Sequence, residues 1–306
     1  MKKRKTLHKI SVLITSIIFM CLSFLAFGIF VKADASTLAT VTNGGAVFLK
    51  TGATYTMSGG SIKNKEATNG GAIYVSESAT FNMNGGTISG NTASVGSGVY
   101  VENGGTYNMS GGTMADDVYT AGSMVYTGGT VSGDITLAGS ENLTIGAVPA
   151  EPLNVIAQTT AVGTKLIKVT ASGFELSDVN ITGLPTGRRV ILSGGYVVVD
   201  HVYYIITWKN ADGTVLETDT VAHGTTPTYD GATPTKASTE QYSYAFKSWD
   251  STVVAATANK TYTATYTATT RSYVVTIGVS PSEYGSVSKT SVTVPYGTSI
   301  SAIRKA

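Results

Sequence analysis

Apolar and polar residues alternate in short segments of residues 44–121, and this pattern repeats every 26 residues. Three copies follow one another at 44–69, 70–95 and 96–121, and a fourth, shortened copy begins at Gly122. Segments such as TFNM have the two-residue period of a β-strand, and runs of glycine, serine and asparagine separate them. Because a repeat this short cannot bury its own apolar face, its copies must stack on one another. The pattern predicts an all-β chain that contains a parallel β-solenoid of 26-residue coils.

Residues at equivalent positions of the copies form columns when parallel strands stack about 4.8 Å apart. We expect an interior column of Met57, Met83 and Met109, continued by Ile135, because these apolar positions alternate with polar ones. Each copy also holds a pair of glycines, as at 85–86, which suits a corner because glycine adopts positive φ without steric cost.

A column of aromatic residues is the candidate ligand-binding site. The segments AVFL, AIYV, GVYV and MVYT each place one aliphatic residue before one aromatic residue. If the aliphatic column faces inward, the aromatic column lies on the surface as a ladder, available to sugars or to a partner's side chains. Rings that only stabilise the sheet, and a reversed alternation that buries them, remain alternatives. The aliphatic column comprises Val47, Ile73, Val99 and Val125, and the aromatic column comprises Phe48, Tyr74, Tyr100 and Tyr126.

The strict period is lost around residues 147–152, and we interpret residues 130–199 as divergent final coils and a cap. The solenoid would then cover residues 36–199. Residues 200–270 have a different pattern, in which a hairpin with Asp212-Gly213 at its turn precedes two further strands. The aromatic residues expected to form the core of this second unit are Trp208, Phe246, Trp249, Tyr262 and Tyr266.

The N-terminal segment has the pattern of an export signal. Four basic residues at 2–5 precede the apolar segment 11–31, and Ala33-Asp34-Ala35 has the small residues that signal peptidase requires. We expect residues 1–35 to be a signal peptide that is cleaved before Ser36, which gives an extracellular or cell-surface protein. The apolar segment is long enough to span a bilayer, so an N-terminal membrane anchor is the alternative.

Export changes the charge balance of the chain. The signal segment holds six of the 21 Lys and Arg residues and one of the 19 Asp and Glu residues, so the mature chain is slightly acidic. Nucleic-acid binding, which needs a basic surface, is therefore not expected. The single cysteine, Cys21, lies in the same segment, and the mature protein would contain no disulfide.

Few residues are candidates for catalysis. A polysaccharide lyase or glycoside hydrolase needs positioned carboxylates, and the acidic residues of the repeats are expected to be turn residues. No serine lies in a G-x-S-x-G context. We therefore expect no catalytic residue, no metal site and no cofactor, with a carbohydrate-active enzyme as the alternative. The residues that such an enzyme could use are Glu66, Glu77, Glu102, Asp116, Asp117, Asp134, Arg188, Arg189, His201 and His223.

The segments GGSIKNKEA, GGTISGNTA and GGTMADDVY resemble the repeats of bacterial adhesin-like surface proteins with right-handed, pectate-lyase-type β-helices. Residues 203–269, with W-x-n-x-DG, G-x-x-P-x-Y-x-G-x-x-P and Y-x-F-x-x-W-x, resemble the internalin-B-type (Listeria–Bacteroides) repeat of Gram-positive surface proteins. Residues 271–306 are similar to a divergent version of that repeat, which the sequence leaves truncated.

The resemblance implies a right-handed β-helix on small β-rich repeat domains that act as spacers. It also implies a non-catalytic, adhesin-like or structural protein of the cell envelope, whose partner is a host or bacterial surface glycan or protein. A purely structural stalk without a ligand is a further alternative.

Overall fold

The computed structural model describes residues 29–31, 41–276, 278 and 291–299. Apart from Ile29–Val31, the expected signal peptide lies outside the described residues, as does most of 271–306. The contacts divide the chain into two units, Met1–His201 and Val202–Ala306. In the described residues the fold is all-β, with one 3₁₀ turn, η2 (Leu176–Asp178), and no helix there is long and apolar enough to cross a membrane.

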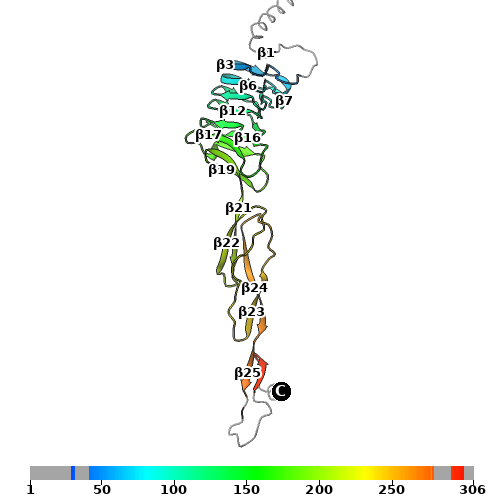
Figure 1. The fold of residues 1–306 in the computed structure, drawn as a ribbon, viewed down its shortest axis with the longest axis vertical. Helices are drawn as coiled ribbons and strands as arrows, with labels where there is room; N and C mark the ends of the chain where they lie inside the picture. The colour runs from blue at the N-terminus through cyan, green and yellow to red at the C-terminus, as the bar shows by residue number, and fades with distance from the viewer. Residues whose placement is uncertain (1–28, 32–40, 277, 279–290, 300–306) are drawn as a thin grey trace, which may run out of the picture. The chain divides into compact units, whose positions relative to one another are not determined.

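The first unit consists of stacked sheets in which strands of successive repeats pair with one another (Figure 1). Pairing is parallel from β2 to β18 in sheet I and from β3 to β17 in sheet II. Sheet I contains, in spatial order, β1 (Ile29–Val31), β2 (Val47–Leu49), β5 (Ile73–Val75), β8 (Val99–Val101), β11 (Val118–Thr120), β14 (Ile135–Leu137), β16 (Leu153–Ala157) and β18 (Val179–Thr182).

Sheet II forms a second side of the stack. Its strands, in spatial order, are β13 (Thr130–Val131), β10 (Thr113–Met114), β6 (Thr80–Ser89), β9 (Thr106–Met109), β12 (Ser123–Tyr126), β15 (Leu143–Ile145), β17 (Lys165–Val169), β20 (Tyr196–His201) and β19 (Arg188–Ser193), and β3 (Thr54–Lys63) also pairs with β6. A short sheet III, β4 (Glu66–Asn69) with β7 (Thr92–Val95), completes the first two repeats.

The apolar columns fill the space between the sheets. Met57 pairs in register with Met83, and Met83 pairs with Met109, and all three side chains are buried as expected. Phe81 and Tyr107 are also completely buried, with ring centroids 4.9 Å apart. The glycine pairs, expected at corners, lie inside β3 and β6 in the first two repeats, where the strand register shifts, and between β9 and β10 in the third. Gly112 has φ +86°, and a Cβ atom there would lie 2.7 Å from the carbonyl oxygen of Gly86 in the previous repeat.

The third repeat is shorter than the sequence period predicts. Its strands β8, β9 and β10 are followed directly by β11, and no described strand continues sheet III beyond β7. As a result Val118, not Val125, pairs with Val99. Every column position extrapolated past this point was therefore wrong.

Three residues are displaced by this shortening. Tyr126 lies in sheet II, where it pairs with Met109 and is only 2% exposed, so it continues the methionine column. Ile135, expected there, instead begins β14 of sheet I. Val125 pairs with Asn108 on the outward face of sheet II.

The strands at the two ends of the stack pair antiparallel, unlike the parallel strands of the repeats. After β17 the chain forms β18 in sheet I and then the hairpin β19–β20, in which β20 pairs antiparallel with both β17 and β19. At the opposite end, β1 pairs antiparallel with β2. Antiparallel strands at an edge interrupt the parallel pairing pattern and limit further strand addition.

The second unit contains a mixed sheet. Tyr262 in Lys260–Thr270 pairs in parallel with Trp208 in Tyr203–Lys209. Asp212-Gly213 forms the turn of the expected hairpin, and Gly213 has φ +90°. Trp208 is 1% exposed and its Nε1 donates to Asp219 at 2.7 Å. Phe246 and Tyr266, expected in the core, lie at its edge and are half-buried. The strand order is β22 (Val215–Ala222), β21 (Tyr203–Lys209), β24 (Lys260–Thr270), β23 (Tyr242–Trp249), and β25 (Ser272–Thr276) pairs antiparallel with β26 (Ser291–Pro295) in a separate sheet.

Candidate functional site

The aromatic ladder lies on the outward face of sheet I. Val47, Ile73 and Val99 are at most 4% exposed and point into the core, so their aromatic neighbours in the same strands point outward. The alternation is therefore the one that presents the rings outward rather than the reverse.

The members of the ladder differ from the expected set at one position. Tyr119 of β11 pairs with Tyr100 of β8, and it takes the place expected for the buried Tyr126. The segment DVYT carries the same pattern as GVYV, and this similarity is the signal in the sequence that identifies Tyr119. The ladder comprises Phe48, Tyr74, Tyr100 and Tyr119.

The rings stack on one another rather than standing apart. Successive ring centroids are 5.3, 4.9 and 4.9 Å apart, with interplanar angles of 23°, 6° and 15°. Tyr74 and Tyr100 consequently have a neighbouring ring on both faces, and Tyr74 is only 8% exposed. Stacking of this kind stabilises a sheet, and it leaves mainly ring edges open to solvent.

The hydroxyl groups of the ladder lie in a partly desolvated environment. Burial raises the pKa of Tyr74 to about 12, and the carboxylate of Glu102, to which its hydroxyl is hydrogen-bonded, adds to this shift together with Tyr100. Burial likewise raises the pKa of Tyr100, with contributions from Tyr119 and Glu102. Both tyrosines are therefore neutral hydrogen-bonding groups at neutral pH.

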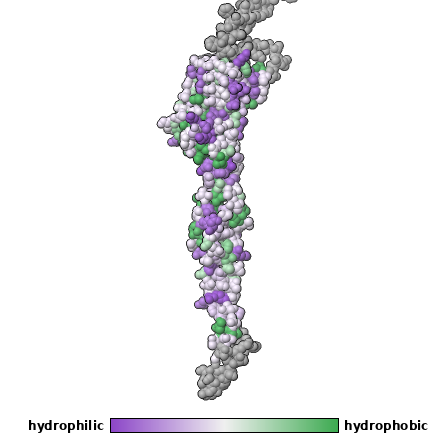
Figure 2. Space-filling view, viewed as in Figure 1, coloured by the Kyte–Doolittle hydropathy of each residue, from purple (hydrophilic) through white to green (hydrophobic). Residues whose placement is uncertain are grey.

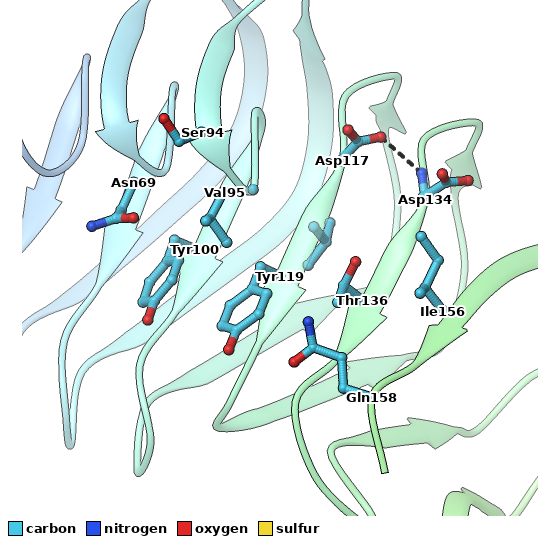
Figure 3. A pocket seen from close by; sticks show the side chains of 12 residues that line it. Asn69, Ser94, Val95, Tyr100, Asp117, Tyr119, Asp134, Thr136, Ile156 and Gln158 are labelled. Atoms are coloured by element: carbon cyan, nitrogen blue, oxygen red, sulfur yellow. Dashed lines mark hydrogen bonds between the residues drawn. The ribbon is translucent and has the colours of Figure 1, made fainter. Parts of the chain in front are cut away.

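A groove of about 470 Å³ opens at the end of the ladder. Figure 3 shows Tyr100 and Tyr119 side by side on successive strands, with Gln158 beyond them and Asp117 and Asp134 where their strands begin. This volume is within the range of pockets that bind small molecules. The residues lining the groove are Asn69, Ser94, Val95, Gly96, Tyr100, Asp117, Val118, Tyr119, Asp134, Thr136, Ile156 and Gln158.

The groove exists because of two local features of the sequence. The shortened third repeat adds no strand to the β4–β7 sheet, so no described strand covers the far edge of β7. Residues 94–96 at this edge form one wall of the groove. In addition, the outward column changes from Tyr119 to the much smaller Thr136, its partner in the next strand, and then to Ile156. The loss of side-chain volume at Thr136 leaves a hollow against the ring of Tyr119.

Polar groups surround this hollow. The Asp117 Oδ1 atom accepts a hydrogen bond of 3.0 Å from the backbone N–H of Asp134, which joins two repeats. Both aspartates are exposed, and among the described residues neither has a basic partner in a salt bridge. The backbone N–H of Gln158 donates to the carbonyl oxygen of Leu137 at 3.1 Å, which fixes the position of its backbone. The side chain of Gln158, with its amide group, is exposed. Hydrogen-bond acceptors and an amide therefore lie beside an aromatic ring.

Asp116, the other half of the acidic pair, has a structural role. Its Oδ1 accepts from the backbone N–H of Gly90 at 2.7 Å, and its Oδ2 accepts from the backbone and side chain of Asn91 at 3.0 and 2.7 Å. In the preceding repeat, Asn91 Oδ1 accepts in the same way from the N–H of Lys65 at 2.9 Å. Asp116 thus continues a ladder of corner residues.

The remaining candidates lie in separate places and do not form one site. Glu102 Oε2 accepts from the backbone N–H of Glu77 at 3.2 Å, so these two residues are neighbours on adjacent repeats. Arg188 lies 3.1 Å from His201 Nδ1, and Arg189 forms a 3.2 Å salt bridge with Asp200, both across the β19–β20 pair. His223 of the second unit contacts Tyr204 at 3.4 Å.

The described residues contain no group of three or more His, Cys, Asp or Glu side chains placed to hold a metal ion. Comparisons of the chain with protein-family models, curated protein sequences and solved structures give no match.

Proposed function

We propose that this chain is an exported, non-catalytic surface protein of the adhesin-like class, and that its first unit is a right-handed β-solenoid that binds a surface glycan or protein. The second unit would act as a spacer. The apolar N-terminal segment followed by Ala33-Asp34-Ala35 supports export, and pairing between successive repeats supports the solenoid.

One observation carries the binding role. The outward column of sheet I places four aromatic side chains in register and ends at a groove that is rimmed by polar groups. Aromatic rings bordered by carboxylates and amides are the usual composition of sites that bind partly apolar, partly hydroxylated ligands. On the face that Figure 2 shows, apolar residues are scattered among polar ones. Scattered apolar residues are normal for a protein surface.

The test uses the mature chain, residues 36–306, on a glycan array and on bacterial and host cells. Binding is expected, and it should weaken at least tenfold when Tyr100 and Tyr119 are both replaced by serine. The double replacement Thr80→Ala with Thr106→Ala, on the outward face of sheet II, is the control and should leave binding unchanged. A wild-type chain that binds neither glycans nor cells would refute the proposed function. Release of reducing or unsaturated sugar by the wild type would favour the enzyme alternative instead.

A further inference from the structure

The stacking of the ladder restricts where a ligand can lie on a ring face. The rings of Tyr74 and Tyr100 have an aromatic neighbour on each side, at centroid distances of 4.9 to 5.3 Å. Tyr119 has such a neighbour only on the Tyr100 side, because its partner in the next strand is Thr136. On the groove side of the ladder, Tyr119 is therefore the ring with an open face.

That open face forms one wall of the hollow in the groove. Thr136 is the floor, and Ile156, its partner in the following strand, is the opposite wall. Because successive parallel strands lie about 4.8 Å apart, the space between Tyr119 and Ile156 is about two strand spacings wide, or roughly 10 Å between backbones. A flat six-membered ring can enter such a space with its face against the tyrosine.

The polar groups lie where a ring in this position would need hydrogen-bond partners. Asp117 and Asp134 precede the inward residues Val118 and Ile135, and Gln158 follows the inward Ala157, so these polar groups lie at opposite ends of the strands (Figure 3). Carboxylates accept from hydroxyl groups, and an amide both donates and accepts. The arrangement is that of one aromatic face with polar groups at two edges.

A pyranose ring fits this set of groups. Its axial C–H bonds form an apolar face that carries partial positive charge, which the negative face of an aromatic ring attracts. Its equatorial hydroxyl groups project from the ring edge, toward the carboxylates at one end and the amide at the other. The absence of a basic residue from the groove lining favours a neutral sugar over an acidic one.

We infer that the hollow between Tyr119 and Ile156 is a subsite for one neutral pyranose ring of a surface glycan, stacked on the open face of Tyr119. The inference rests on the proposed function and gives it a ligand class and a location. Tyr119 provides the stacking face, Asp117, Asp134 and Gln158 bind hydroxyl groups, and Thr136 leaves the necessary space. Phe48 and Tyr74 support the ladder without touching the sugar.

The test fills the hollow without removing any polar group. Thr136→Tyr places a fifth ring on the ladder and occupies the sugar's position, while Thr182→Tyr makes the same change in the same outward column beyond Ile156 and outside the groove lining. The mature chain is titrated by NMR with the methyl glycosides of glucose, galactose and mannose at millimolar concentrations, as expected for a single ring. Thermal unfolding of each variant shows that it is folded.

We expect at least one glycoside to shift resonances of the groove, and we expect Thr136→Tyr and Tyr119→Ala each to weaken binding at least tenfold. Thr182→Tyr should bind as the wild type does. Unchanged sugar affinity in folded Thr136→Tyr would overturn the subsite, and array binding that persists in this variant would leave the proposed function standing. Binding to cells that protease treatment of the cells abolishes, without any response to the glycosides, would also overturn it and identify a protein partner.

Discussion

Replacement of Met83 by aspartate tests the interior of the stack most directly. The Met83 side chain is completely buried between Met57 and Met109, which are its partners in the adjacent repeats. The hydroxyl of Tyr107 also contacts its sulfur at 3.4 Å. A carboxylate at this position would have only that hydroxyl as a polar neighbour among these residues.

The magnitude has two parts. Loss of the methionine side chain removes apolar contacts, for which truncation of a buried methionine costs about 2–5 kcal/mol. A buried, unpaired aspartate takes up a proton rather than remain charged, and at pH 7, about three units above its ordinary pKa, this costs roughly 4 kcal/mol. The sum is about 6–9 kcal/mol, which is a large share of the stability of a typical domain.

The assay is urea denaturation of residues 36–306, followed by circular dichroism at pH 7 and pH 4. The matched control is Asn82→Asp, which places the same charge on the adjacent outward residue, where Asn108 Nδ2 still has an oxygen to donate to. The control should change stability by less than about 0.5 kcal/mol. The deficit of Met83→Asp should shrink at pH 4, because about half of the aspartate in the unfolded chain is then protonated too. Stability of Met83→Asp within about 1 kcal/mol of the wild type at pH 7 would refute the interior column.

Two further predictions concern the corner residues and the ladder. Asp116→Ala should destabilise the chain by about 1–3 kcal/mol in urea denaturation, because it leaves the N–H groups of Gly90 and Asn91 without their acceptor. Asp116→Asn should destabilise the chain less. Equal losses of stability in the two variants would contradict this role. Because the pKa of Tyr74 is raised to about 12, its contribution to the free energy of unfolding is fully present below pH 10 and should be lost as the pH rises through 12. The wild type should lose roughly 2 kcal/mol of stability over this range relative to Tyr74→Phe. Parallel stability profiles of the two proteins against pH would contradict this.

The sequence predicted the features that depend on strict periodicity. Met57, Met83 and Met109 share a column because 26 residues separate them and the alternation around them assigns one face to the core. The outward position of Phe48 follows from the buried Val47 for the same reason. Within exact repeats, the position of one residue determines the positions of its equivalents.

Prediction failed where the length of a repeat changed. The third repeat turns directly from β10 into β11, so Tyr119 replaces Tyr126 in the ladder although the period favours Tyr126. Periodicity cannot reveal this, because strand pairing depends on backbone hydrogen bonds and on burial of apolar side chains, not on the number of residues between two strands. The similarity of DVYT to GVYV, and the absence from the third repeat of a segment equivalent to TASV at 92–95, are the local signals.

The same irregularity explains why the groove lies at this place in the stack. Within the exact repeats Tyr74 and Phe81 each have an aromatic ring above and below them, and the two strands of sheet III adjoin each other, so a regular stack covers its own binding surfaces. A hollow needs a position at which a large side chain faces a small one and a strand is missing. Both conditions are met next to Tyr119, where Thr136 follows in the outward column and β7 has no described successor. In this protein, regular repeats provide stability, and the departure from regularity at the third repeat creates the space that a ligand can occupy.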